Sequence, residues 1–285
     1  MNSVSILFRI FGGITLFLFG IRLISEQSQK FGRQWMRKTL ANSSNEVPRS
    51  LFNGFRMAWA MQSASGVLSF IMGISESMII VLPAALAMGL GANLGTVFTA
   101  WLLAVKWNAV AFLIVGFGIL GILFGKSERT KVLAYLLLGT GFLFLGMESM
   151  KIGFAPLRNS EGIMLLISKL NGTDLFSVFQ GMILGGILSA LFGSRIAVTG
   201  LVIAVGSHGV LNFPGCASII LGVNLGTIAR IHSIDVPINY ISNGVKQVKL
   251  GLSLLNGLGI LVIVPLFFGL VRLIDGFIPG TTNEG

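Results

Sequence analysis

A seven-residue sequence occurs twice in this chain. Residues 90–96 are Leu-Gly-Ala-Asn-Leu-Gly-Thr, and residues 221–227 repeat them with one Ala-to-Val change, so the second copy begins 131 residues after the first. The same offset aligns Pro83 with Pro214. Further pairs at this offset are Gly54 and Gly185, Ser63 and Ser194, and Val67 and Val198. An offset kept over such a length indicates that the chain contains one structural unit twice.

The duplicated unit lies in a very apolar chain. Hydrophobic residues make up 54% of the 285 residues and charged residues 11%, whereas a soluble domain has about 25% charged residues. Residues 4–24, 105–124, 132–150 and 248–274 form apolar runs near the ~20 residues that a membrane-spanning helix needs. The sequence therefore predicts an all-α integral membrane protein, and duplication in such a protein is typical of secondary transporters.

The middle of each half is apolar but interrupted by Gly, Ser, Asn and Gln, which indicates re-entrant or broken helices. We predict re-entrant helical hairpins over residues 51–76 and 175–207, each followed by a broken transmembrane helix. Three crossings in each half would invert the second half relative to the first. The predicted inverted-topology repeats are residues 1–125 and 126–285, within a single membrane domain. The alternative is a bundle of eight to ten unbroken helices without inversion.

The net charge of +10 is explained best by membrane topology. Seven of the Lys and Arg residues lie in residues 22–56, and the positive-inside rule places this segment in the cytoplasm. The amino terminus is then outside, and the expected location is the inner (cell) membrane of a bacterium. Residues 30–56 are suited to contact anionic membrane lipids, so we expect no nucleic acid partner.

A polar cluster, Gln62-Ser63-Ala64-Ser65-Gly66, interrupts the first predicted hairpin. At a hairpin turn, freed backbone N–H groups and the positive end of a helix dipole favour an anion. Gln62, Ser63 and Ser65 are therefore candidate substrate-binding residues. The alternative is that these side chains hydrogen-bond across a helix interface.

The repeated motif supplies a second set of polar candidates: Asn93 and Thr96 in one copy, Asn224 and Thr227 in the other. Glycines on both sides of the Asn would allow the helix to open and expose carbonyl oxygens to a small cation, with Asn and Thr as further ligands or helix caps. The alternative is that the glycines permit close helix packing and the Asn bonds a neighbouring helix.

The order of a Gln-Ser-x-Ser hairpin, an apolar stretch and Gly-Ala-Asn-Leu-Gly-Thr, duplicated in the second half, resembles the type II sodium/phosphate cotransporter family. The similar segments 16–20 and 142–146 look like the repeated first helix of that family. The resemblance implies a secondary transporter of inorganic phosphate or a related anion. It also implies alternating access at a midplane site between two hairpins, with sodium as the candidate coupled ion and no other cofactor.

The second hairpin departs from the family motif. Gly193, Ser194, Arg195 and Ile196 stand where Gln-Ser-Ser-Ser is expected, so only Ser194 matches, and Thr199 adds a hydroxyl nearby. An arginine at membrane depth is costly unless it faces a cavity, a partner or an anion, and guanidinium can hold phosphate with two parallel hydrogen bonds. The alternatives for Arg195 are an ion pair and a side chain that reaches the lipid headgroups.

This departure leaves a second function open: a non-transporting or substrate-shifted membrane protein of the same fold, handling for example a lipid phosphate. The sequence has no nucleophile triad, phosphate-binding loop or metal motif, so we do not expect an enzyme. Small residues at 181, 185, 189 and 193 favour close packing within the chain, with a homodimer as the alternative use of that face.

Overall fold

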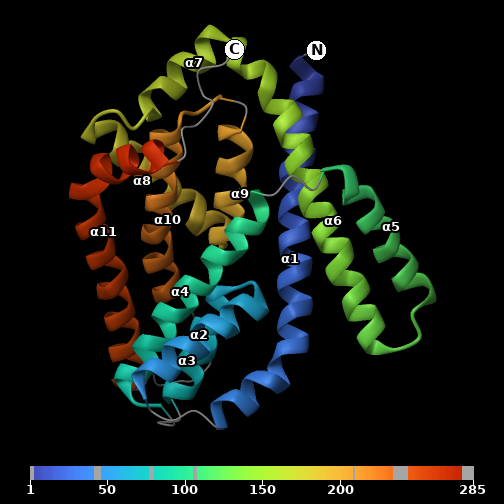
Figure 1. Ribbon diagram of the computed structural model, residues 1–285, viewed down its shortest axis with the longest axis vertical. Coiled ribbons are helices and arrows are strands. Elements are labelled where there is room, and N and C mark those ends of the chain that lie inside the picture. Colours follow the sequence, from blue (N-terminus) through green and yellow to red (C-terminus); the bar gives the residue numbers. More distant parts are fainter. Residues whose placement is uncertain are drawn as a thin grey trace. The chain divides into compact units, whose positions relative to one another are not determined.

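The computed structural model describes residues 3–41, 46–76, 80–104, 108–207, 209–233 and 243–277 (Figure 1). Every regular element among these residues is a helix, which confirms the predicted all-α class. Within these described ranges, five helical segments are long and apolar enough to cross a membrane: Val4–Lys30, Glu128–Asn159, Leu175–Phe192, Phe213–Ser233 and Asn243–Phe277. The chain is an integral membrane protein.

The chain divides into two compact units, and each is described here by itself. The first-hairpin unit comprises Ile14–Met147 and Arg230–Ser253. The second-hairpin unit comprises Met1–Gly13, Glu148–Ala229 and Leu254–Gly285. The predicted repeat boundary at residues 125 and 126, and the inversion of one repeat relative to the other, stay predictions.

The first-hairpin unit contains the first predicted hairpin, formed by its second and third helices. Their bounds are α1 (Ser3–Ala41), α2 (Val47–Met61), α3 (Ala64–Glu76), α4 (Leu82–Ala104), α5 (Asn108–Phe124) and α6 (Glu128–Phe154); α1 and α6 also extend into the other unit. The helix α2 begins four residues before the expected position 51. Pro48 lies in its first turn, where proline's fixed φ favours helix initiation and its missing N–H costs nothing.

The second-hairpin unit follows with short helices and then a second hairpin. The bounds are η1 (Ala155–Asn159), α7 (Glu161–Ile167), η2 (Ser168–Leu170), α8 (Leu175–Phe192), α9 (Arg195–Gly206), α10 (Phe213–Ser233) and α11 (Asn243–Phe277), of which α10 and α11 extend into the first-hairpin unit. Asp174 caps α8, with its carboxylate accepting from the N–H groups of Phe176 and Ser177. The helix α8 has 18 residues, or about 27 Å, so its length suffices for a full crossing.

The prediction of a broken transmembrane helix after each hairpin is wrong. The helix α4 is continuous through residues 91–96, and α10 is continuous through residues 222–227. A Cβ atom added to Gly91 would overlap the carbonyl oxygen of Leu51 on α2, and one added to Gly222 would overlap that of Met182 on α8. The glycines are therefore used for close packing, and the backbone carbonyls stay in their helices.

These close contacts recur in both units at the offset of 131 residues. In the first-hairpin unit an added Cβ would meet the backbone of the partner helix at three pairs: Gly54 with Met88, Gly91 with Leu51, and Gly95 with Phe55. In the second-hairpin unit the corresponding pairs are Gly185 with Ile219, Gly222 with Met182, and Gly226 with Gly186. The sequence duplication thus corresponds to a duplicated helix contact.

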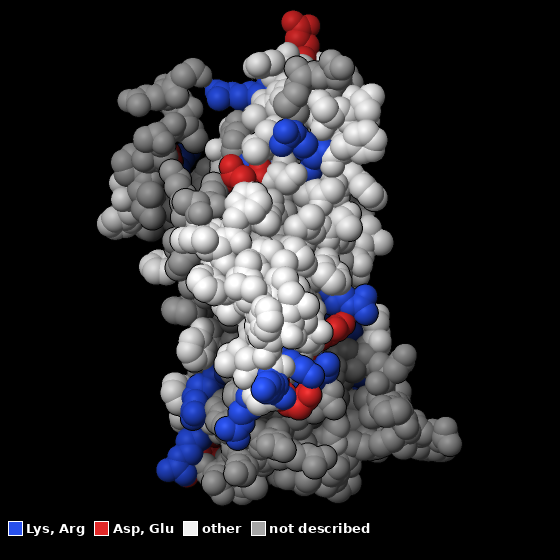
Figure 2. All heavy atoms as spheres, turned by 90° about the vertical axis from the view of Figure 1, so that its right-hand side faces the viewer, with Lys and Arg blue, Asp and Glu red and all other residues white. Residues whose placement is uncertain are grey.

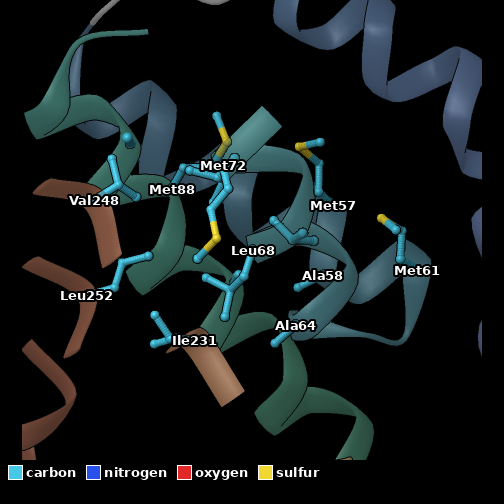
Figure 3. Close-up of a cluster of buried hydrophobic side chains, with 14 of the residues drawn as sticks. Met57, Ala58, Met61, Ala64, Leu68, Met72, Met88, Ile231, Val248 and Leu252 are labelled. Atoms are coloured by element: carbon cyan, nitrogen blue, oxygen red, sulfur yellow. The ribbon is translucent and has the colours of Figure 1, made fainter. Parts of the chain in front are cut away.

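A methionine-rich core lies under the first hairpin. Met57 and Met72 are fully buried with Met88, and Val248 and Leu252 of α11 pack against them (Figure 3). Unbranched methionine side chains fill irregular gaps between helices. The core therefore joins both helices of the first hairpin to α4 and α11.

The helix α5 presents an apolar face outward. Phe112, Phe117 and Leu123 are 73%, 64% and 70% exposed. Figure 2, in which α5 is turned toward the viewer, shows a broad uncharged surface in this region. Such a surface suits contact with lipid acyl chains.

Candidate functional site

The turn of the first hairpin has an unusual backbone at Gln62. Its φ of 51° and ψ of 30° are left-handed, and among the described residues it is the only non-glycine residue with positive φ. The Gln62 Nε2 donates to the carbonyl oxygen of Trp59 at 2.9 Å. The N–H of Ser63 donates to the carbonyl oxygen of Ala58 at 3.3 Å. A left-handed conformation costs a residue with a Cβ roughly 1–2 kcal/mol. Such strain is concentrated at functional sites.

Ser63 and Ser65 meet at the start of α3. The Ser63 Oγ accepts from the N–H of Gly66 at 3.1 Å and lies 3.1 Å from the Ser65 Oγ. Ser63 is thus the cap of a helix whose amino-terminal end has partial positive charge. The structure brings Gln62, Ser63 and Ser65 together in one turn that is rich in hydrogen-bonding groups and contains no charged side chain.

A cavity of about 370 Å³ lies beside this turn, within the first-hairpin unit. The polar residues of its lining, within the part of the chain that the structure describes, are Gln62, Ser28 on α1 and Thr140 on α6. Sequence reasoning missed Ser28 and Thr140. Thr140 is an isolated hydroxyl in an apolar stretch and donates to the carbonyl oxygen of Leu136 in its own helix. Ser28 lies in the polar stretch 25–30 of α1, and nothing in the sequence places either residue beside Gln62.

The turn of the second hairpin has the same backbone with different side chains. Gly193, equivalent to Gln62 by the repeat offset, has a φ of 62°. Ser194 accepts from the N–H of Ala197 at 3.3 Å, as Ser63 does from Gly66. The Thr199 hydroxyl donates to the carbonyl oxygen of Arg195 at 3.0 Å, within the first turn of α9.

Arg195 is the first residue of α9 and is half-buried. It stands at the position of Ala64 in the first hairpin. A cation is disfavoured at the amino-terminal end of a helix because it adds to the positive end of the helix dipole. The sum of the guanidinium charge and this dipole makes the second turn suited to an anion.

The Asn and Thr residues of the repeated motif lie within intact helices. The Thr96 hydroxyl donates to the carbonyl oxygen of Asn93 at 2.8 Å, and that of Thr227 donates to Val223 at 3.1 Å. Both threonines are buried, whereas Asn93 and Asn224 are half-buried. The described residues contain no group of three His, Cys, Asp or Glu side chains suited to a metal ion. Sodium binding at these positions stays a prediction.

Sequence comparisons find relatives that match most of the chain and a family model that matches part of it. The family model described as Na+/Pi-cotransporter matches residues 16–152. The "Putative inorganic phosphate export protein YjbB" of Salmonella typhimurium is 21% identical over 271 residues, which is 94% of this chain and 48% of that protein. The Escherichia coli K12 protein of the same name is 21% identical over 261 residues, or 91% of this chain and 46% of that protein.

A Bacillus subtilis relative, "Uncharacterized protein YqeW", is 24% identical over 231 residues, covering 79% of this chain and 70% of that protein. The chain spans about half the length of the phosphate export relatives that it matches. No solved structure matches it. The chain is thus similar to the Na+/Pi-cotransporter family over residues 16–152, which include the first hairpin, and to the phosphate export relatives over nearly its full length.

Proposed function

We propose that this chain transports inorganic phosphate across the membrane as a secondary transporter that works by alternating access. One observation supports the proposal most: a serine-capped helix start occurs in both hairpins, with strained Gln62 in one copy and charged Arg195 in the other. Hydrogen-bond donors and one positive charge at helix amino termini are the chemistry that binds phosphate. The family and the named phosphate export relatives agree with this substrate.

In this proposal Gln62, Ser63 and Ser65 are the anion-binding residues of the first turn, and Ser194, Arg195 and Thr199 are those of the second. Sodium is the proposed coupling ion, with Asn93, Thr96, Asn224 and Thr227 shaping or binding its site. The Arg195 guanidinium offers the positive charge that a bound cation would otherwise give. Transport that does not depend on sodium is therefore the variant of the proposal to test first.

The test is uptake of radiolabelled phosphate into proteoliposomes of the full chain, with and without a sodium gradient. We expect saturable uptake that falls roughly tenfold or more in Arg195→Gln, because a hydrogen bond to a charged group contributes about 1.5–3 kcal/mol. Arg195→Lys keeps the charge but not the bidentate geometry, so we expect partial uptake. Efflux from preloaded vesicles tests the export direction that the relatives' name suggests.

Failure of this proposal has a clear form. If correctly inserted protein takes up no phosphate or other anion in either condition, the chain is not a transporter of this class. Equal uptake by Arg195→Gln and the unmodified chain would remove Arg195 from the site.

A second candidate function is a membrane protein of the same fold that handles a lipid phosphate or serves as a subunit. The second turn favours this function, because Gly193, Arg195 and Ile196 replace the Gln and two of the three serines of the Gln-Ser-Ser-Ser motif. Purification in native lipid would distinguish it, because this function predicts a stoichiometric partner or a retained lipid phosphate with no phosphate uptake.

A further inference from the structure

The cavity beside the first hairpin turn is larger and more apolar than a phosphate ion requires. Its volume of about 370 Å³ is many times the ~30 Å³ share of a water molecule. It lies within the range of small-molecule sites, which are mostly apolar with a few polar groups that orient the ligand. Apart from Gln62, Ser28 and Thr140, the described residues of the lining are apolar.

None of the described residues that line this cavity has a charged side chain. A phosphate ion among these residues would have no cation beside it, and burial of an unpaired charge is strongly unfavourable. The apolar walls come from several helices, including Ile24 on α1, Ile114 on α5 and Phe144 on α6. The cavity interior therefore favours an uncharged, largely apolar ligand.

The polar groups of the lining can both donate and accept hydrogen bonds. The Gln62 amide donates to the Trp59 carbonyl oxygen, and the Thr140 hydroxyl donates to the Leu136 carbonyl oxygen. These bonds use one of the two Gln62 N–H groups and the Thr140 hydroxyl hydrogen, so the second Gln62 N–H can donate to an ester oxygen, and the Gln62 Oε1 and Thr140 Oγ1 lone pairs can accept. Such a lining matches an alkyl chain that has a hydroxyl group or another uncharged polar group at one end.

The cavity has an exposed lining residue and adjoins an apolar helix face. Ala60, one of the lining residues, is exposed. The helix α5, which contributes Ile114, has neighbouring apolar side chains that face outward: Leu113 is 61% exposed. An exposed apolar helix next to a partly open apolar cavity gives an acyl chain a continuous apolar path.

We propose that this cavity binds an acyl chain of a membrane lipid, with the uncharged glycerol or ester region of that lipid at Gln62, Ser28 and Thr140. The site is independent of phosphate transport, but the two share Gln62. A bound lipid would hold the Gln62 side chain and so couple the lipid environment to the first hairpin turn.

The experiment uses the full chain in nanodiscs that contain phosphatidylethanolamine with a diazirine in the middle of one acyl chain. After irradiation, labelled peptides are mapped by mass spectrometry. We expect labelling within residues 136–144, which line the cavity, in addition to labelling of the exposed face of α5. The labelling of α5 is the internal standard, because its outward face is labelled by the surrounding lipid whether or not the cavity holds an acyl chain.

Ala60→Trp fills the cavity from an exposed position, and Leu113→Trp adds the same side chain one residue before Ile114, outside the lining. Excluding even two methylene groups from an apolar site weakens binding by about tenfold. We therefore expect Ala60→Trp to reduce labelling within residues 136–144 by about that factor relative to α5. Leu113→Trp should leave the ratio unchanged. Ala60→Phe is a smaller filling variant for use if Ala60→Trp does not fold.

Two results would overturn the proposal. One is labelling within residues 136–144 that is unchanged in the folded filling variants. The other is loss of this labelling in the unmodified chain when millimolar inorganic phosphate is added, because that would assign the cavity to the anion. Neither readout requires transport activity, so a failure of the transport proposal would not affect it.

Discussion

The turns of the two hairpins share their backbone and differ in their side chains. Gln62 and Gly193 both have left-handed φ angles, and Ser63 and Ser194 both cap the helix that follows. Beside these shared features, Arg195 replaces Ala64, so one turn is neutral and strained while the other is charged and unstrained.

This difference separates what the fold requires from what the ligand requires. The positive φ and the serine cap are needed to reverse the chain between two helices, and they are present in both copies. A Gln side chain is not needed for the turn, because Gly193 makes the same turn at lower conformational cost. The side chains that differ, Gln62 in one turn and Arg195 in the other, are the ones that the proposed function assigns to contact with the anion.

The largest expected effect concerns the glycines that both units share. In Gly91→Ala the added Cβ would overlap the Leu51 carbonyl oxygen, and in Gly222→Ala it would overlap that of Met182. Backbone cannot move aside as a side chain can, so each change should cost about 3 kcal/mol or more. Thermal unfolding in detergent, followed by size-exclusion chromatography, measures the loss. Gly116→Ala, with open space around it, should be neutral or gain up to about 1 kcal/mol.

If Gly91→Ala destabilised the protein and Gly222→Ala did not, the two helix contacts would not be equivalent. The comparison of the two units would then be limited to their turns.

The next effect comes from exchanging the turn residues. Gln62→Gly should raise stability by about 1 kcal/mol because it relieves the left-handed strain, and it should lower phosphate uptake if Gln62 contacts the anion. Gly193→Gln should lower stability by roughly 1–2 kcal/mol because it introduces that strain. Unfolding temperature and proteoliposome uptake are measured for both variants. A Gln62→Gly protein with full uptake would leave the strain without a functional explanation.

A smaller effect concerns two buried serines in comparable helix contacts. Ser50 is fully buried, and within the described residues its Oγ has no hydrogen-bond partner. Ser218, also fully buried, donates to the carbonyl oxygen of Gly215 at 2.8 Å. Ser50→Ala should therefore raise stability by about 1 kcal/mol, whereas Ser218→Ala should lower it by a similar amount, about 1 kcal/mol. Equal losses in the two variants, in the same unfolding assay, would show that Ser50 has a partner in solution.

The smallest effect distinguishes the starts of the two hairpins. Hydrogen bonds from the Ser177 hydroxyl, and then from the N–H groups of Ser177 and Phe176, hold the pKa of Asp174 below its usual value, although desolvation opposes them. A lowered folded-state pKa means that this stabilisation is present above the unfolded value of about 3.9. It is lost as the pH falls through the folded value.

Asp174→Ala should therefore lower the unfolding temperature at neutral pH, and this difference should shrink as the solution is acidified below pH ~4. Asp174→Asn keeps a capping side chain without a titrating group and is the control. At the start of α2, Glu46 makes no capping hydrogen bond with its side chain, so Glu46→Ala should change little. A pH-independent loss in Asp174→Ala would argue against the carboxylate's contribution.

Several features could be predicted from sequence because they depend on residues close together in the chain. Apolar runs predict the membrane-spanning helices, and a polar cluster in an apolar segment predicts a turn near Gln62. The serine caps at Ser63 and Ser194 follow from the same local rules, because a cap bonds an N–H group three residues ahead.

The failed prediction, the opening of the helices at the repeated Gly-x-Asn motif, concerns contacts between distant residues. A glycine in a helix permits either a break or a close neighbour, and the sequence around it is compatible with both. At Gly91 and Gly222 the structure has a close neighbouring helix, because the backbones at Leu51 and Met182 lie against these glycines. Thr140 and Ser28 were missed for the same reason, since only packing places them beside Gln62.

The sequence by itself determined that this protein is a helical membrane protein with one unit written twice, because composition and periodicity act through local physics. It also located both turns, since glycine, glutamine and serine at matched positions specify a chain reversal and a helix cap. Only the tertiary structure decided that the repeated glycines close a helix contact, that Gln62 is strained and that an apolar cavity adjoins it. Those properties arise from the distances between helices, which no single segment encodes.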